Sequence, residues 1–195
     1  SDTFAQKNQG QTRDSSVTIS KDLIRRAKAE GCKANVTISA ALGCPFEGEV
    51  PIARVVDMAV SLADAGPHEI ALADTIGVGD PWRVELLFQS VRDALPDMPL
   101  RAHFHNTRNT GLANVYAAIR AGAVTIDGSI GGIGGCPFAP NATGNVPTED
   151  VVYMLHRHDL HTGTSLSGLC DTAHWLSETM GKTLPGMVSR AGGFP

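Results

Sequence analysis

The sequence has few aromatic residues, no long apolar run and no excess of positive charge. Aromatic residues make up 5% of its 195 residues. No apolar segment approaches the roughly 18 residues that a membrane-spanning helix needs. The formal net charge is −4, from 16 lysines and arginines against 20 aspartates and glutamates, so nothing marks a surface for nucleic acid. We therefore expect neither a membrane nor a nucleic acid as partner.

The sequence also lacks paired cysteines. Its four cysteines are scattered, with no CxxC pair, at Cys32, Cys44, Cys136 and Cys170. This spacing excludes a zinc knuckle and does not indicate a disulfide framework. Reduced thiols are typical of a cytosol-like compartment, so we expect a cytoplasmic protein.

Helical and strand patterns alternate along the chain. The spacing of apolar residues predicts helices over 17–30, 50–65, 80–95, 110–121, 147–158 and 167–180, and strands over 33–41, 68–74, 100–105 and 123–130. Such alternation indicates an α/β protein with a parallel sheet. No GxGxxG follows a first strand, which argues against a dinucleotide fold. The strand count fits either a doubly wound sheet or part of an eight-stranded barrel, which usually takes about 250 residues.

Polar residues follow three successive predicted strands. Asp74 ends one strand, His103 and His105 end the next, and a glycine-rich loop with Cys136 and Asn145 follows the last. Active sites of parallel α/β folds form at this carboxyl-terminal edge. The placement favours the barrel and predicts a functional site there.

His103-Phe104-His105 is the sharpest local signal. Residues i and i+2 of a strand project from the same face, so both imidazoles can reach one point in space. Two imidazole nitrogens at this spacing suit a divalent metal. The alternative is a pair of polar histidines at a sheet edge, bonded to backbone or to a carboxylate.

The glycine-rich loop carries one thiol, Cys136, and four glycines in 131–138. A backbone of this kind can approach a ligand closely, and a cysteine at such a place can donate a proton or act as a nucleophile. The alternative is a loop with an incidental thiol. For Asn145, Glu149 and Asp150 the simpler interpretation is capping of the helix that follows. Asp74 fits two interpretations equally well: a functional residue at the end of its strand, or part of a turn that leads into the next helix.

Five motifs together resemble one known family. They are ALGCPFEGEV (41–50), ALADTIGVG (71–79), HFHNT (103–107), GGIGGCPFAPNATGN (131–145) and PTEDVVYML (147–155). They resemble 3-hydroxy-3-methylglutaryl-CoA (HMG-CoA) lyase, within the wider group of metal-dependent TIM-barrel lyases and Claisen-type synthases. The similarity covers nearly the whole chain. It implies an incomplete (β/α)8 TIM barrel, about strands 4–8 with their following helices, as one partial domain over 1–195.

The resemblance also implies a reaction and a metal site. An enzyme of this family splits an acyl-CoA substrate into acetyl-CoA and a keto acid, acetoacetate for HMG-CoA, with Mg²⁺ or Mn²⁺. By motif position the metal ligands would be His103, His105 and Asn145. Cys136 would protonate the acetyl-CoA enolate, and His103 would double as acid or base on the tertiary hydroxyl.

Two carboxylates complete the implied site. Asp74 matches the family's carboxylate near the substrate hydroxyl. Glu149 matches a carboxylate that lies next to the metal ligands without binding the metal itself. The resemblance further implies a role in leucine degradation and ketone-body formation. It implies a homo-oligomer, dimer or tetramer, in the cytoplasm or, in a eukaryote, in the mitochondrial matrix.

Three departures qualify these expectations. Nothing before Lys33 matches the family's first-strand aspartate ligand and its adjacent arginine, and the opening SDTFAQKN instead resembles the region around the fourth strand. We therefore expect 1–195 alone to be inactive. After His105 the chain reads Asn-Thr-Arg-Asn, where animal lyases have Asp-Thr-Tyr-Gly. The resemblance therefore does not specify which acyl group the protein recognises.

Two alternative functions stay open. One is a Claisen-type synthase, which Asn106-Thr107 and the Gly-Gly-Cys-Pro loop disfavour. The other is an inactive barrel fragment with a binding role.

Overall fold

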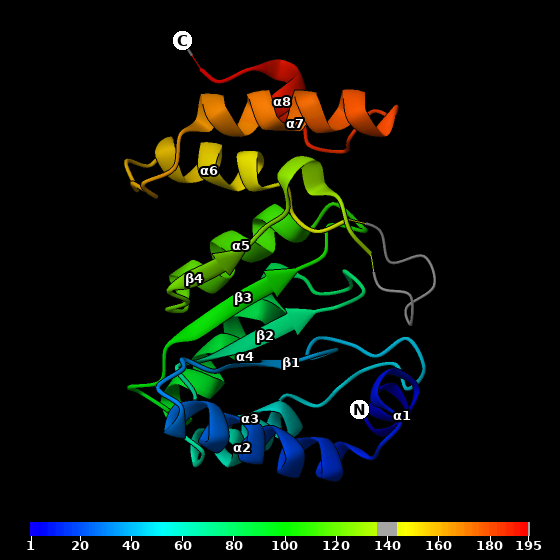
Figure 1. Cartoon of the computed structure of the whole chain (residues 1–195), viewed down its shortest axis with the longest axis vertical. Coiled ribbons are helices and arrows are strands. Elements are labelled where there is room, and N and C mark those ends of the chain that lie inside the picture. The colour runs from blue at the N-terminus through cyan, green and yellow to red at the C-terminus, as the bar shows by residue number, and fades with distance from the viewer. Residues whose placement is uncertain (136–143, 195) are drawn as a thin grey trace.

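The computed structural model describes residues 1–135 and 144–194, which form a parallel sheet with helices packed against it (Figure 1). The elements are α1 (Asp2–Gln9), α2 (Arg13–Ala29), β1 (Asn35–Ile38), α3 (Ile52–Ala63), β2 (Glu69–Asp74), α4 (Pro81–Ala94), β3 (Leu100–Phe104), α5 (Gly111–Arg120), β4 (Thr125–Asp127), the 3₁₀ turn η1 (Ile130–Gly132), α6 (Thr148–His156), α7 (Leu166–Met180) and α8 (Val188–Ala191). Among these residues no helix is both long and apolar enough to cross a bilayer.

The four strands lie side by side in chain order and all run parallel. Helices α3, α4 and α5 follow one another over a single face, where their apolar side chains join those of the strands in one core. A doubly wound sheet reverses its strand order and carries helices on both faces. The observed winding is that of a barrel wall, so the structure decides between the two predicted architectures.

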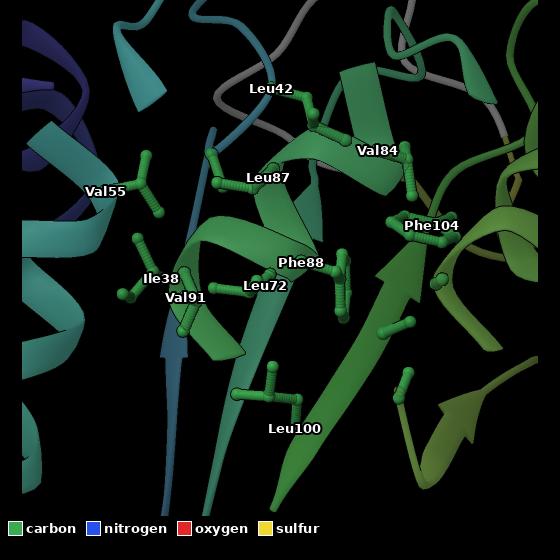
Figure 2. Close-up of a cluster of buried hydrophobic side chains, with 14 of the residues drawn as sticks. Ile38, Leu42, Val55, Leu72, Val84, Leu87, Phe88, Val91, Leu100 and Phe104 are labelled. Carbon is green, nitrogen blue, oxygen red and sulfur yellow. The ribbon is translucent and has the colours of Figure 1, made fainter. Parts of the chain in front are cut away.

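The core lies between this face and the helices (Figure 2). Leu72 of β2, Leu100 and Phe104 of β3, and Leu87 and Phe88 of α4 are almost fully buried. The rings of Phe88 and Phe104 meet edge to face, with centroids 6.2 Å apart, an arrangement that aromatic pairs favour. Burying one such side chain stabilises the fold by about 1.5–3 kcal/mol. This core fixes β3, and with it the histidine motif.

The predicted helices and strands are present with shifted ends, and the last predicted strand is shorter than expected. The strand predicted over 123–130 is only Thr125–Asp127, because Gly128 and the left-handed Gly131 and Gly132 turn the chain into η1. The opening segment is helix α1, whose first turn is capped by the Ser1 hydroxyl. The described residues contain four strands. Helix α8 was not predicted.

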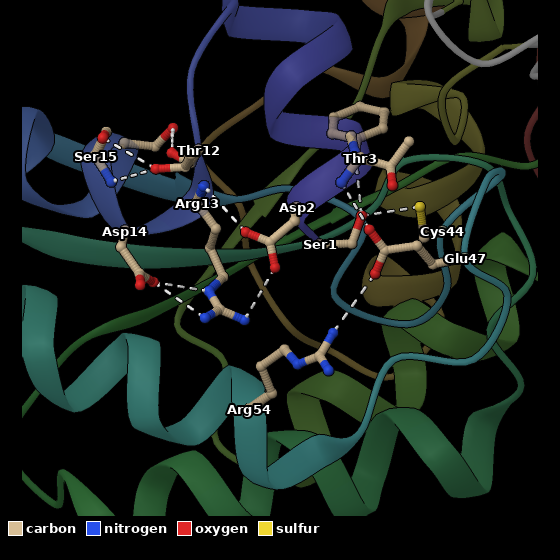
Figure 3. A network of polar contacts seen from close by, with 12 residues as sticks. Ser1, Asp2, Thr3, Thr12, Arg13, Asp14, Ser15, Cys44, Glu47 and Arg54 are labelled. Carbon is tan, nitrogen blue, oxygen red and sulfur yellow. Dashed lines mark hydrogen bonds and ion pairs between the residues drawn. The ribbon is translucent and has the colours of Figure 1, made fainter.

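A polar network holds α1 against the loop that follows β1 (Figure 3). The Ser1 hydroxyl donates to the Cys44 sulfur at 2.9 Å, and the backbone N–H of Thr3 donates to the Glu47 carboxylate at 2.6 Å. Arg54 of α3 lies 3.6 Å from the same carboxylate. Backbone hydrogen bonds join Cys44 and Gly48 in both directions. Cys44 is therefore a packing residue of this loop.

Candidate functional site at the carboxyl-terminal edge of the sheet

The structure gathers the predicted site residues at one edge of the sheet. Asp74 is the last residue of β2, His103 lies in β3, and His105 follows directly after β3. The backbone N–H of His105 donates to the Asp74 carbonyl at 3.2 Å, which ties the two strand ends together. Asn145 pairs with His105 in an isolated antiparallel bridge. Cys136 lies outside the described residues.

The two imidazoles project from the same side of β3. Their ring centroids are 5.6 Å apart and their planes are inclined by 65°. The His105 residue is buried, whereas the His103 side chain is one third exposed. His103 has a carboxylate neighbour, because its Nδ1 lies 3.3 Å from Oδ2 of Asp127 on β4. The pair therefore joins a buried ring to a partly accessible one.

The side chain of Asn145 is held through its amide nitrogen, and its amide oxygen accepts no hydrogen bond from the described residues. Its Nδ2 donates to the Ile133 carbonyl at 3.1 Å, and its Oδ1 is buried with no hydrogen-bond partner in the described parts of the chain. The capping role expected for Asn145 is wrong, because Pro147 occupies the N-cap of α6 and no side chain caps that helix. An unpaired buried acceptor is costly unless a ligand completes it.

Gly134 makes room for this asparagine. Its φ is 116°, and a Cβ there would lie 2.6 Å from Asn145 Nδ2. A side chain at this position would therefore be strained and would also displace the amide. The glycine spacing of the loop is thus explained in part by the need to accommodate Asn145.

The Asp74 carboxylate is fully buried, and both of its oxygens accept hydrogen bonds from the turn that follows β2. Oδ1 accepts from the backbone N–H of Val78 at 3.0 Å, and Oδ2 accepts from Gly79 at 2.8 Å. Burial raises the pKa of Asp74, against these hydrogen bonds, which lower it. The geometry supports the helix-entry turn, one of the two interpretations that the sequence left open.

The two carboxylates at the start of α6 reach outward to other segments. Both oxygens of Glu149 accept from the Gly131 N–H, at 3.1 and 3.0 Å. Asp150 accepts from the N–H groups of Met187 and Val188, the latter at 2.7 Å. Neither bond caps α6 itself, so the capping expectation is wrong for this pair. Glu149 instead fixes the first part of the glycine-rich loop.

A charged row beside the histidines was missed by sequence reasoning. Arg101 of β3 contacts Glu69 of β2 at 2.6 Å and Asp127 of β4 at 2.5 Å. Two hydrogen bonds lower the pKa of Asp127, and the one from His103 has a larger effect than the one from Arg101. The hydrogen bond from Arg101 to Glu69 also lowers the pKa of Glu69. A signal was present, because Arg101 stands two residues before His103 and so shares its face of the strand.

The donor set at this edge fits a divalent metal in part. His103, His105 and Asn145 offer two imidazoles and a buried amide oxygen, all groups that bind such ions. The described residues contain no cluster of three or more His, Cys, Asp or Glu that could hold a metal, so they do not by themselves complete a metal site. The unpaired Oδ1 of Asn145 is the observation that favours a cation here.

Comparison with known proteins gives consistent matches. The model of the HMGL-like family matches residues 1–176. The (R)-citramalyl-CoA lyase of Chloroflexus aurantiacus is 45% identical over 165 residues, which cover 85% of this chain and 52% of that protein. The hydroxymethylglutaryl-CoA lyase YngG of Bacillus subtilis is 39% identical over 185 residues, 95% of this chain and 62% of that protein.

The structural match extends over almost the whole chain. The solved structure of an HMG-CoA lyase from Acinetobacter baumannii, in complex with coenzyme A and 3-methylmalate, aligns with a TM-score of 0.92 at 34% identity, covering 99% of this chain and 63% of that one. The chain thus spans between about half and two thirds of the length of the proteins it matches. With a family model matched over 176 residues and a similar fold, the chain belongs to the HMGL-like family.

Proposed function

We propose that the protein containing this chain is a CoA-ester carbon–carbon lyase that cleaves HMG-CoA or a close 3-hydroxy-3-methylacyl-CoA. The observation that carries the proposal is the convergence of His103, His105 and Asn145 at one sheet edge, with Asn145 Oδ1 left without a hydrogen-bond partner among the described residues. Two relatives, 45% and 39% identical to this chain, bear the names of CoA-ester lyases, which supports the same reaction class.

His103, His105 and Asn145 would hold Mg²⁺ or Mn²⁺, as enzymes of this family generally depend on a divalent metal. When bound, such an ion polarises carbonyl oxygens and eases deprotonation of a hydroxyl group. His103 is the ligand with an accessible side chain. It is therefore the residue we assign to proton transfer at the tertiary hydroxyl of the substrate.

The proposed cleavage is a retro-Claisen step. The hydroxyl proton passes to a base, the oxygen forms the new ketone, and the bond between C2 and C3 of the acyl group breaks. Its electron pair becomes the enolate of acetyl-CoA, which takes up one proton. The products of HMG-CoA are acetoacetate and acetyl-CoA, so atoms and charge balance. Cys136 is our candidate for the donor of that last proton.

Two carboxylates support this arrangement without touching a reacting atom. Glu149 accepts hydrogen bonds from the backbone N–H of Gly131, five residues before Cys136. It thereby fixes the start of the glycine-rich loop. Asp74 orders the turn through Gly79 beside the strand end that carries the histidines. For Asp74 we therefore propose a positioning role near the substrate hydroxyl.

Citramalyl-CoA is a second candidate substrate, and one observation favours it. The citramalyl-CoA lyase is 45% identical to this chain, against 39% for the hydroxymethylglutaryl-CoA lyase of Bacillus subtilis. Citramalyl-CoA is one methylene shorter between carboxylate and carbinol carbon and would give pyruvate in place of acetoacetate. The chemistry at the cleaved bond is the same for both.

The test is a coupled assay of acetyl-CoA release by the full-length protein with Mg²⁺ or Mn²⁺. HMG-CoA and citramalyl-CoA are compared, and each is repeated with Cys136→Ala and His103→Ala. We expect release from at least one substrate and a loss of about 100-fold or more in both variants. Wild-type rates in both variants would refute the residue assignments. Condensation of acetyl-CoA with a keto acid, without cleavage activity, would point to a synthase.

A further inference from the structure

Four charged or ionisable side chains form a continuous row across the polar face of the sheet. Glu69 of β2 binds Arg101 of β3, Arg101 binds Asp127 of β4, and Asp127 reaches His103. Each Asp127 oxygen has its own partner, Oδ1 with Arg101 and Oδ2 with His103. The row therefore ends on one of the two histidines of the candidate metal site.

The strand register explains why the row can form. Arg101 lies opposite Ala71 on β2 and Thr125 on β4, while His103 lies opposite Ala73 and Asp127. In-register residues of parallel strands project to the same face, and the two alanines leave space beside the longer side chains. The guanidinium can therefore extend to a carboxylate on each neighbouring strand.

The Asp127 carboxylate can only accept hydrogen bonds when it is ionised, so a neutral His103 facing it must carry its proton on Nδ1. That leaves the lone pair on Nε2, the nitrogen that faces away from Asp127. Histidines that bind metals are commonly oriented in this way by a carboxylate on the other nitrogen. Arg101 holds Asp127 in place through a planar group with several donors.

We propose that Asp127, clamped by Arg101, is a positioning residue that fixes His103 as the Nδ1–H tautomer and directs Nε2 toward metal and substrate. The proposal rests on the proposed function for what Nε2 binds, whereas the tautomer itself is a property of this chain alone. The competing explanation is that the row is merely an ion-pair network that stabilises the sheet.

Two isosteric variants separate these explanations. Asp127→Asn and Glu69→Gln each remove one carboxylate charge from Arg101, but only Asp127 contacts His103. An asparagine can turn its NH₂ group toward Nδ1, which favours a proton on Nε2, and such a tautomer change is known to be costly in a catalytic histidine. A purely structural network would respond to both substitutions alike.

The first measurement is the ring ¹⁵N NMR spectrum of the histidine-labelled protein at about pH 8, above the ordinary imidazole pKa of about 6.5. The His103 signal is assigned by its loss in His103→Gln. We expect the Nδ1–H tautomer in the wild type and in Glu69→Gln, and the Nε2–H tautomer in Asp127→Asn. A wild-type His103 protonated on Nε2 would overturn the proposal, even if the Asp127 variant failed to fold.

The second measurement is Mn²⁺ affinity by EPR titration without substrate. We expect Asp127→Asn to bind Mn²⁺ about 10–100-fold more weakly and Glu69→Gln to bind as the wild type does. Equal weakening in both variants, or none in Asp127→Asn, would contradict the proposed role of Asp127. If the wild type bound no Mn²⁺ and released no acetyl-CoA but showed the tautomer switch, the proposed function would fail and the assigned tautomer would stand.

Discussion

His105 and Asn145 face each other across an antiparallel bridge, although 40 positions separate them in the chain. The backbone of Asn106 donates to Gly144 and that of Val146 donates to Phe104, at 2.9 and 3.0 Å, so the pairing continues on either side. The segment that returns from the glycine-rich loop is thereby attached to the end of β3. This attachment brings an amide oxygen to the histidine motif.

The first prediction concerns that amide oxygen. Asn145→Ala should weaken Mn²⁺ binding by about tenfold or more, because it removes a buried acceptor for which residues 1–135 and 144–194 offer no hydrogen-bond partner. EPR titration of the full-length protein measures the affinity. Asn35→Ala, on an exposed position of β1, is the matched control and should bind as the wild type does. Unchanged affinity in Asn145→Ala would exclude Asn145 as a ligand.

The sequence was sufficient to predict the edge of the sheet at which the candidate site residues meet. Strand ends carrying Asp74 and the two histidines could be identified because apolar runs mark parallel strands and polar residues directly follow them. The motif resemblance added Asn145, whose bridge to His105 depends on a tertiary contact. No local pattern contains that contact.

The position of Arg101 on the His103 face of the strand was visible in the sequence, but the ion pairs of the row could not be predicted, for a related reason. Glu69, Arg101 and Asp127 lie on three strands, and their meeting depends on the register between those strands. The backbone partners of Glu149 and Asp150 could not be predicted, because an acidic first helical turn is normally explained by the helix dipole. Here both carboxylates bind backbone N–H groups of distant segments, which only the packed fold brings within reach.

The second prediction concerns the Asp74 turn. Asp74→Asn should lower the free energy of unfolding by about 1–3 kcal/mol, because one acceptor becomes an NH₂ group facing a fixed backbone N–H of Val78 or Gly79. Relief of the buried charge opposes this loss, but the N–H groups cannot turn away. Urea unfolding measures the change, with the exposed Asp97→Asn as control. A stabilised Asp74→Asn variant would show that burial of the charge dominates.

The third prediction concerns the contact between the segment before α8 and the glycine-rich loop. Gly186 donates to the Gly131 carbonyl at 3.0 Å, and a Cβ on Gly186 would collide with the Glu149 carboxylate. Gly186→Ala should therefore destabilise the fold by about 1–3 kcal/mol. Gly193→Ala, where a Cβ would meet only Leu166 at 3.4 Å, should stay within about 0.5 kcal/mol of the wild type. Thermal unfolding of both variants tests this, and equal stability would show that α6 can shift.

The last prediction concerns stability in acid. The hydrogen bond from Arg101 lowers the pKa of Glu69 below its ordinary value of about 4.3. Between the two pKa values the unfolded chain binds more protons than the folded one, so this pair contributes stability that is complete above about pH 4.3 and is lost as the pH falls through the folded pKa. Glu69→Gln cannot titrate. Its deficit against the wild type should therefore be largest near neutral pH and should shrink in more acidic solution. Urea unfolding over a pH series measures this, with the exposed Glu178→Gln as control. A deficit that stays constant with pH would mean that Arg101 does not hold Glu69 in its ionised form.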